Sequence, residues 1–277
     1  MALLAAAARV VPDRVAAVAT FDHGTGPAAR RGVDLVKREA SRLGITCHTG
    51  RAAGTIPARE AEWRAARWTF LRQVSAMYGA SIATAHTRDD QLETVVIRLL
   101  RLAGARGLAG LYADTGVVRP LVQVPRAVVL EYAVQARVPS VSDPSNSSRD
   151  HLRNRVRLDL LPALRRARPT IDHELLAAAR LAADWRASFE RLVDKLHPVR
   201  MGGDGALASV AAADLAKYDG ATLAVIWPVL AARAGVTLDR RGTCRLAQFT
   251  THGRVGGVIQ LSGGVEVART RFWFVFR

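Results

Sequence analysis

The densest group of polar side chains lies between two apolar runs, in Ala85-His86-Thr87-Arg88-Asp89-Asp90-Gln91-Leu92-Glu93-Thr94. Asp90 and Glu93 are three positions apart, so a helix that starts at Asp89 carries both carboxylates on one face near its first turn. Such a pair can hold a cationic amine or a magnesium ion, or accept a proton from a nucleophile. Taken singly, Asp89 as a helix cap and His86 as a hydrogen-bonded core residue would be ordinary structural features.

A second group of side chains is basic. Arg153 and Arg157 are four positions apart and therefore share a helix face, and Arg149 precedes them by one turn. Guanidinium groups spaced in this way can hold phosphates through paired hydrogen bonds. The alternative is a solvated helix face, enriched in arginine by the composition of the chain.

The first half of the chain alternates short β-like runs with longer helical ones. Strands are predicted at Val15–Phe21, Ile45–His48 and Ser81–Ala85, and helices at Ala28–Leu43, Pro57–Tyr78, Asp89–Leu102 and Val128–Ala136. This alternation predicts an α/β fold with a doubly wound parallel sheet. In such sheets ligands bind at the carboxyl ends of the strands, where the acidic segment falls.

The second half has a different character. Val138–Ser148 is a concentrated turn signal, and helices are predicted at Asp150–Leu164, Ile171–Leu196, Leu207–Tyr218, Thr222–Ala234 and Leu238–Phe249. Two or three antiparallel strands are expected at Gly256–Leu261, Val265–Ala268 and Phe272–Phe276, around the turn Ser262-Gly263-Gly264. We therefore predict an α/β domain over residues 1–168 and a smaller, mostly helical domain with a short β end over residues 169–277.

Composition limits the class of protein further. The 277 residues are 49% hydrophobic and 23% charged, which excludes a disordered or coiled-coil chain. Forty Lys and Arg against 24 Asp and Glu give a formal charge of +16, which favours a polyanion such as nucleic acid, with a membrane surface as the alternative. Only three of the cations are lysine, so a codon bias toward arginine explains part of this charge.

The cysteine count and the hydropathy bear on the compartment. Cys47 and Cys244 are far apart and in no C-x-x-C pair, which disfavours a disulfide framework and a cysteine metal site. No stretch approaches the ~20 apolar residues that cross a bilayer. The opening MALLAAAARVV lacks the basic residues that precede the apolar core of a signal peptide, so a cytoplasmic location is expected.

Several further segments accompany the acidic one in a recognisable order. They are Phe21-Asp22-His23-Gly24, Glu60–Arg67, Arg101–Leu111, Arg119-Pro120-Leu121, Asp143-Pro144-Ser145-Asn146, Arg153-Asn154-Arg155-Val156-Arg157 and Leu161-Pro162. Together these segments resemble the tRNA(Ile)-lysidine synthase family. The block D-D-Q-x-E-T is shared with related ATP pyrophosphatases that thiolate tRNA, whereas D-P-S-N and R-N-R-x-R narrow the resemblance to the lysidine synthases.

The resemblance implies an ATP-dependent ligase of the PP-loop type that requires magnesium. The family adenylates the carbonyl oxygen at carbon 2 of the cytidine at the first anticodon position of an isoleucine tRNA with the anticodon CAU. The ε-amino group of free L-lysine then attacks carbon 2 and displaces AMP. The implied partners are this tRNA, free lysine and, in a homodimer, a second copy of the chain. Synthesis of 2-thiocytidine is disfavoured because the chain lacks paired cysteines.

The resemblance also implies roles for individual residues. Catalytic roles fall on His86, Asp89, Asp90 and Glu93; Asp90 and Glu93 would hold the lysine amine, and Asp89 would complete the acidic pocket or bind magnesium. Asp22 and His23 would border the adenosine, and Arg101 with Gly104 would line the pocket. Substrate contacts are also expected from Asn154 and Arg155, and RNA contacts from Arg149, Arg153 and Arg157. Thr87 stands where many relatives have a second histidine.

One departure from the family concerns the glycine-rich loop S-G-G-x-D-S that wraps the pyrophosphate of ATP. No such loop occurs here, and in relatives it runs into a helix that begins with letters such as M-A-L-L, which are Met1-Ala2-Leu3-Leu4 in this chain. The first hypothesis is an active enzyme whose start lies upstream, with about 20–30 further residues that encode a strand and this loop. The second is a catalytically inactive tRNA-binding remnant.

Overall fold

The computed structural model describes all residues except 25, 53–59, 142–147 and 203–205. The chain forms two compact units, Met1–Asp184 and Trp185–Arg277. The division falls inside one helix, α9 (Ile171–Leu196), and not between residues 168 and 169 where the sequence placed the boundary. The reason is that the early part of α9 packs Leu175 and Leu176 on the first unit, whereas Val193 belongs to the core of the second.

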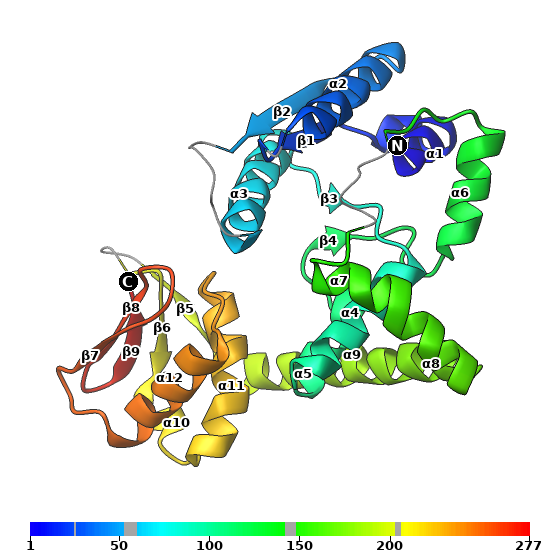
Figure 1. Cartoon of the computed structure of the whole chain (residues 1–277). Helices are drawn as coiled ribbons and strands as arrows, with labels where there is room; N and C mark the ends of the chain where they lie inside the picture. Colours follow the sequence, from blue (N-terminus) through cyan, green and yellow to red (C-terminus); the bar gives the residue numbers. More distant parts are fainter. Residues whose placement is uncertain (25, 53–59, 142–147, 203–205) are drawn as a thin grey trace. The chain divides into compact units, whose positions relative to one another are not determined.

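The first unit contains short parallel strands and most of the helices (Figure 1). Its strands are β1 (Val18–Asp22), β2 (Cys47–Arg51), β3 (Ile82–Ala83) and β4 (Val117–Val118). Its helices before α9 are α1 (Ala2–Val10), α2 (Pro27–Arg42), α3 (Glu60–Tyr78), α4 (Arg88–Leu100), α5 (Ala105–Leu108), α6 (Arg126–Gln135), α7 (Leu152–Arg155) and α8 (Leu161–Ala167). Short 3-10 turns lie at Pro12–Arg14 and Gly110–Tyr112. The expected alternation of strands and helices is therefore present.

The strands of this unit pair in parallel, as predicted for an α/β fold. β1 pairs with β2 in the register Val18 to Cys47, and β3 pairs with β4 in the register Ile82 to Val117. In the described part of the chain the two pairs are not joined into one sheet by hydrogen bonds. β4 lies in the stretch from Asp114 to Arg126, which the sequence left as a connection, because two residues are too few to produce a periodic pattern.

The arginine-rich segment is not one continuous α-helix as predicted for Asp150–Leu164. It begins at Leu152, widens to a π-helical turn at Val156–Leu160, and returns to α-helix at Leu161. Pro162 is the second residue of α8 and has no N–H to donate to the preceding turn, so a local change of helix type is expected there. Val156 and Leu161 are buried with Leu92 and Val96 of α4, which holds the segment against the acidic helix.

The second unit contains a five-stranded antiparallel sheet covered by helices. The strand order is β5 (Arg200–Met201), β6 (Ala208–Ala211), β9 (Trp273–Phe276), β8 (Glu266–Arg269) and β7 (Val258–Gln260). The helices are α10 (Ala212–Leu215), α11 (Gly220–Arg233) and α12 (Arg240–His252). The turn predicted at Ser262-Gly263-Gly264 joins β7 to β8, and both glycines have positive φ angles near 80°.

The prediction of a helix over Leu207–Tyr218 is wrong for its first part. Ala208–Ala211 is strand β6, with Ala208 and Val210 buried and the residues between them half-buried. This alternation has a period of two, which indicates a strand, but alanine favours helices and four residues are too few to separate the two periods. The β end of this unit is accordingly larger than the two or three strands expected.

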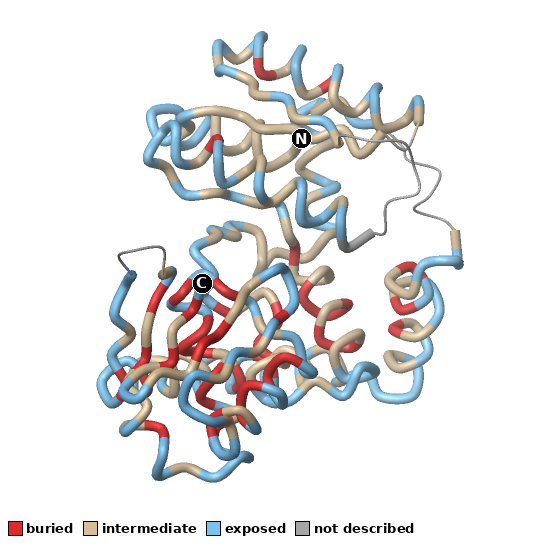
Figure 2. The backbone as a smooth tube through the Cα atoms, turned by 90° about the vertical axis from the view of Figure 1, so that its left-hand side faces the viewer, coloured by how far each residue is buried: buried red, intermediate tan, exposed pale blue. Residues whose placement is uncertain are grey.

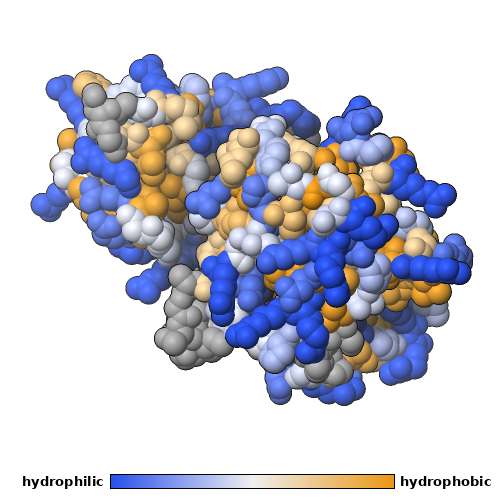
Figure 3. Space-filling view, turned by 90° about the horizontal axis from the view of Figure 1, so that it is seen from above, coloured by the Kyte–Doolittle hydropathy of each residue, from blue (hydrophilic) through white to orange (hydrophobic). Residues whose placement is uncertain are grey.

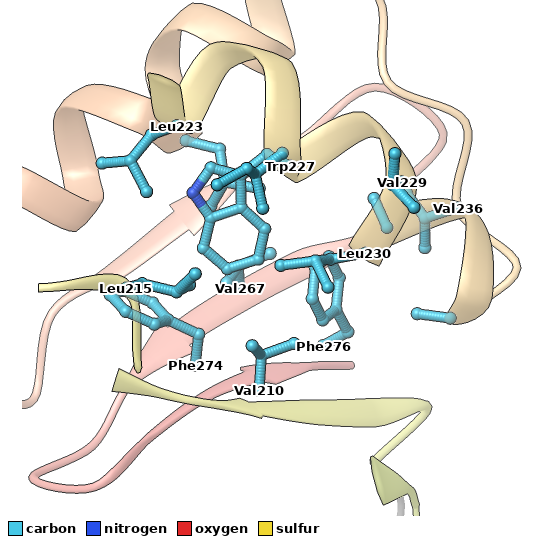
Figure 4. Packing of buried hydrophobic residues seen from close by; sticks show 14 of the residues in the cluster. Val210, Leu215, Leu223, Trp227, Val229, Leu230, Val236, Val267, Phe274 and Phe276 are labelled. Carbon is cyan, nitrogen blue, oxygen red and sulfur yellow. The ribbon is translucent and has the colours of Figure 1, made fainter. Parts of the chain in front are cut away.

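The core of the second unit is built around Trp227 (Figure 4). Its indole lies edge-on to Phe274, with ring centroids 5.4 Å apart, and its Nε1–H donates to Thr250 Oγ1 at 2.8 Å. In the part of the chain that the structure describes, no helix is long and apolar enough to cross a membrane.

Candidate active site

Helix α4 begins with a reciprocal capping arrangement. Thr87 is the N-cap, and its backbone N–H donates to Asp90 Oδ2 at 2.8 Å, while Thr87 Oγ1 donates to the same oxygen at 2.7 Å. The helix therefore starts at Arg88, one residue before the start assumed from the sequence, and Thr87 rather than Asp89 caps it. This arrangement fixes the Asp90 carboxylate at the helix start.

The carboxylates of Asp90 and Glu93 lie on one face of α4, as their spacing predicted. Glu93 is only 1% exposed, and Arg157 holds it with two bonds, from Nε to Oε1 at 2.6 Å and from Nη2 to Oε2 at 3.1 Å. Arg153 joins the two carboxylates, since its Nε lies 2.6 Å from Glu93 Oε2 and its Nη2 lies 3.0 Å from Asp90 Oδ1. Arg153 and Arg157 therefore share a helix face as predicted, and their guanidinium groups contact carboxylates.

A third arginine, Arg126, completes this cluster, and the sequence analysis did not select it. Its Nη2 lies 3.1 Å from Asp90 Oδ1 and 3.6 Å from Glu93 Oε1, and its backbone N–H donates to Asp89 Oδ2 at 2.7 Å. Asp89 also lies 4.0 Å from Arg165. The only signal in the sequence was an arginine directly after Pro125, at the end of the predicted connection and two residues before the helix predicted at Val128–Ala136. We call Asp89, Asp90, Glu93, Arg126, Arg153 and Arg157 the acid–arginine cluster.

The surroundings of Asp90 favour its ionised form. Burial alone would raise the pKa of Asp90, but the hydrogen bonds from Thr87 and the charges of Arg126 and Arg153 outweigh it and hold that pKa below its usual value. The hydrogen bond to Glu93 raises the pKa of Arg157. At neutral pH Asp90 is therefore a carboxylate anion, paired with the guanidinium groups of Arg126 and Arg153.

His86 follows β3, close enough to Asp90 for the two charges to interact. Its Nδ1 lies 2.8 Å from Thr84 Oγ1. Burial lowers the pKa of His86; Asp90 opposes this change, and Arg119, Arg153 and Arg64 reinforce it. The imidazole is consequently neutral at pH 7 and can accept or donate a proton.

Asp22 and His23 lie at the carboxyl end of β1, as predicted. Asp22 Oδ1 accepts from the Gly24 N–H at 2.8 Å, in a turn that Gly24 enters with a φ of 72°. The His23 ring lies against Phe21 and Trp63, with centroids 5.2 and 6.3 Å away. Burial, with a smaller effect of Arg67, lowers the pKa of His23.

A cavity of about 700 Å³ separates β1 from β3. Its walls include Val18–Phe21 of β1, Ile82–Ala83 of β3 and side chains of α1 and α3, and His23 and His86 line it where the strands end. In β1, Val18 and Asp22 bond toward the β2 side, through the Thr46 carbonyl and the Ala52 N–H. Because backbone groups alternate in direction along a strand, those of Ala19 and Phe21 face the opposite side, toward this cavity. Among the residues that the structure describes, no strand pairs with β1 or β3 on the side that faces this apolar slot.

Other predicted site residues lie outside the cluster. Arg101 follows the last turn of α4, and Gly104 precedes α5, so both are at the opposite end of this helix from Asp90, about 16 Å along its axis. Arg149 is exposed and paired with Asp159 at 3.0 Å, and Arg155 is exposed. Asn154 is buried and donates to the Ser148 carbonyl at 2.7 Å. The segment Asp143-Pro144-Ser145-Asn146 lies outside the described residues.

Gln91, within the acidic segment, has a structural position. It is fully buried, its Nε2 donates to the Ala109 carbonyl at 3.1 Å, and its Oε1 accepts from the Leu111 N–H at 2.6 Å. Gly110, between these two residues, has a φ of 60°, and a Cβ there would collide with the Gln91 amide. Gly110 thus allows the close backbone approach expected from the sequence, whereas a Cβ at Gly104 would meet no atom within 4 Å.

The carboxylates do not fit a resident magnesium ion. Within the described residues there is no group of three or more His, Cys, Asp or Glu side chains that could hold a metal. Asp90 and Glu93 face guanidinium groups, and Asp89 accepts a backbone N–H and lies near Arg165. The geometry suits recognition of charged groups by carboxylates and arginines.

Comparison with known proteins gives the class first. The PP-loop domain matches residues 1–164, more than half of the chain. A solved structure, the U34-tRNA thiolase NcsA from Methanococcus maripaludis with its [4Fe-4S] cluster, has a TM-score of 0.48 and 17% identity, covering 59% of this chain and 61% of that one. The chain is a PP-loop protein.

The particular family follows from the curated relatives. The tRNA(Ile)-lysidine synthase of Salinispora arenicola is 35% identical over 97% of this chain and 84% of its own length. The synthase of Rhodopseudomonas palustris is 41% identical over 53% of this chain and 45% of its own, so the chain spans less than half of that relative. The chain belongs to the tRNA(Ile)-lysidine synthase family.

Proposed function

We propose that this protein ligates L-lysine to carbon 2 of the first-anticodon-position cytidine in an isoleucine tRNA with the anticodon CAU, at the expense of ATP. The observation that carries the proposal is the acid–arginine cluster at the start of α4. It puts the Asp90 and Glu93 carboxylates on one face, beside the neutral His86 that follows β3. Membership of the lysidine synthase family supplies the substrates.

The reaction has two steps. The oxygen on carbon 2 of the cytidine attacks the α-phosphorus of ATP, and pyrophosphate leaves. The lysine ε-nitrogen then attacks carbon 2, the carbon–oxygen bond breaks, and AMP leaves. The lysine ammonium must lose a proton before it attacks, because only the neutral amine has a free electron pair.

The chain's own residues fit the lysine step. Asp90 and Glu93 would bind the ammonium through charge-assisted hydrogen bonds, which are stronger than neutral ones. Neutral His86 would accept a proton from the lysine ammonium, and the imidazolium so formed could pass that proton to the departing phosphate. Arg153 and Arg157 hold the carboxylates in place and would bind an anionic group that arrives beside the amine.

The tRNA and ATP requirements are supported less directly. The formal charge of +16 favours a polyanion, and hydrophilic side chains cover much of the face seen in Figure 3. Arg149 and Arg155 are exposed and would contact phosphates. ATP use is a property of PP-loop proteins, and Asp22 and His23 would border the adenosine.

The competing function is tRNA binding without catalysis, because the loop S-G-G-x-D-S does not occur in the 277 residues. The slot between β1 and β3 also favours this alternative. The strand edges beside the expected nucleotide site have no pairing partner among the described residues. Synthesis of 2-thiocytidine remains the third candidate, and the chain has only Cys47 and Cys244 for sulfur chemistry.

The test is transfer of labelled L-lysine to a transcript of isoleucine tRNA with the anticodon CAU. The purified chain should attach lysine only when ATP is present, and a transcript with the anticodon GAU should stay unlabelled. Salt-sensitive tRNA binding with no transfer would establish the remnant instead. Incorporation of sulfur in place of lysine would establish the thiolation alternative.

A further inference from the structure

Arg126 reaches the acid–arginine cluster from a different element than the other two arginines. It is the first residue of α6, whereas Arg153 belongs to α7 and Arg157 to the π-helical turn. Its backbone is fixed to α4, since its N–H donates to Asp89 at 2.7 Å and the Arg88 N–H donates to the Val124 carbonyl at 2.9 Å. The side chain of Arg126 can therefore change rotamer about an anchored backbone.

The guanidinium of Arg126 is held less tightly than those of Arg153 and Arg157. The latter two each contact Glu93 at 2.6 Å and form a second bond within the cluster. Arg126 reaches Asp90 at 3.1 Å and Glu93 only at 3.6 Å, both through the same nitrogen. Its buried Nε has no hydrogen-bond partner among the described residues. Displacing the guanidinium of Arg126 therefore costs less free energy than displacing that of Arg153 or Arg157.

The carboxylate oxygens leave no vacant place for an amine. Asp90 Oδ2 accepts two bonds from Thr87, and Asp90 Oδ1 is shared by Arg126 and Arg153. Both oxygens of Glu93 accept from Arg157, and Oε2 also accepts from Arg153. Every oxygen of these two carboxylates is therefore already occupied by Thr87 or by a guanidinium group. An ammonium can bind these oxygens only if one guanidinium group leaves them.

We propose that Arg126 is an exchangeable positioning residue whose guanidinium occupies the place that the substrate ammonium takes between Asp90 Oδ1 and Glu93 Oε1. Arg126 leaves this place when the amine enters, so the charge of the cluster is unchanged and the released guanidinium becomes available to an anion. No covalent bond forms or breaks in this exchange. The inference rests on the proposed function, since it takes lysine as the amine.

The test is calorimetric titration of the full chain with L-lysine and with n-butylammonium, an amine without a carboxylate. Arg126→Ala removes the competing cation, so both ligands should bind about tenfold more tightly than to the wild type, the value of one charge-assisted hydrogen bond. Arg126→Lys keeps the charge and should bind them as the wild type does. Arg38→Ala, which removes an exposed arginine of α2, is the matched control and should change nothing.

A second measurement separates exchange from a structural role of Arg126. Millimolar guanidinium chloride should refill the vacated place in Arg126→Ala and restore the weaker wild-type affinity for lysine, whereas sodium chloride at equal ionic strength should not. A merely structural role predicts no such rescue and weaker lysine binding in Arg126→Ala.

The outcomes distinguish the exchange from the proposed function. Lysine binding that is unchanged or weakened in Arg126→Ala overturns the exchange and leaves the function standing. Tighter binding of both ligands, with no preference for lysine over n-butylammonium, supports the exchange and contradicts lysine as the substrate. Absence of binding of either amine to Arg126→Ala overturns the exchange outright.

Discussion

The core of the second unit and the strands of the first bury their apolar side chains to very different extents. Trp227, Phe276 and Leu230 are completely buried in the second unit, and Figure 2 shows many buried residues near the C-terminus. None of the five residues of β1 is buried, and β1 faces a cavity of about 700 Å³. Each Å² of apolar surface that is buried on folding contributes roughly 25 cal/mol to the stability of the folded state. The second unit therefore has its own completed core, whereas the β1–β3 region lacks one.

The acid–arginine cluster differs from both regions, because charge and not apolar packing holds it. Glu93 is as buried as the core residues of the second unit, yet it is stabilised by Arg153 and Arg157. Removing one member of such a buried group leaves an unpaired charge. The first unit thus combines a well-held chemical site with a loosely packed strand region.

The largest expected effect is in the second unit. Trp227→Ala should lower the free energy of unfolding by about 3–5 kcal/mol, since it removes a fully buried indole and leaves a cavity. The control is Trp185→Ala, at a residue that is 42% exposed and stacked on Phe189, with an expected loss of about 1 kcal/mol. Denaturant unfolding measures both, and equal losses would contradict the description of a closed core.

The next effect is in the acid–arginine cluster. Glu93→Gln should lower the free energy of unfolding of the first unit by about 2–3 kcal/mol, below the range for fully buried ion pairs because the arginines are partly exposed. Glu131→Gln, at an exposed residue bonded to Gln135, is the matched control and should cost under about 0.5 kcal/mol. Denaturation of each variant, monitored by hydrogen exchange of the α4 amides, compares the two losses of unfolding free energy. A loss in Glu93→Gln no larger than the control's would show that the cluster is not held by charge pairing.

The smallest effect needs no substitution. Along β1, the amide of Val18 donates to Thr46 and should be protected from hydrogen exchange, whereas those of Ala19 and Phe21 face the slot and should exchange rapidly. Residue-resolved NMR measures this alternation. Uniform protection along the strand would mean that another segment of the chain pairs with the slot edge.

Sequence patterns predicted local features of this protein well and tertiary pairings poorly. The i, i+3 spacing of Asp90 and Glu93 was enough to put both carboxylates on one face, and α9 has the bounds predicted from its periodicity. That Arg153 and Arg157 bind Glu93 depends on residues some sixty positions apart, which no local pattern encodes. Arg126 was missed for the same reason.

Short strands were the other failure. Two-residue β4 and four-residue β6 carry too few side chains to show a period, and the alanines of β6 favour the helix that the sequence analysis predicted there. In both, the pairing partner determines the structure: β3 for β4, and β9 for β6.

The central claim is that the α4 carboxylates act on the lysine amine, and Asp90→Asn tests it most directly. Asparagine keeps an oxygen for the Thr87 hydrogen bonds but loses the charge. With ATP, lysine and the tRNA with the anticodon CAU, this variant should still form adenylated tRNA while lysine transfer falls about 10- to 100-fold, the value of one hydrogen bond to a charged group. Lysine transfer at the wild-type rate, or an equal loss of adenylation and transfer, would contradict the account.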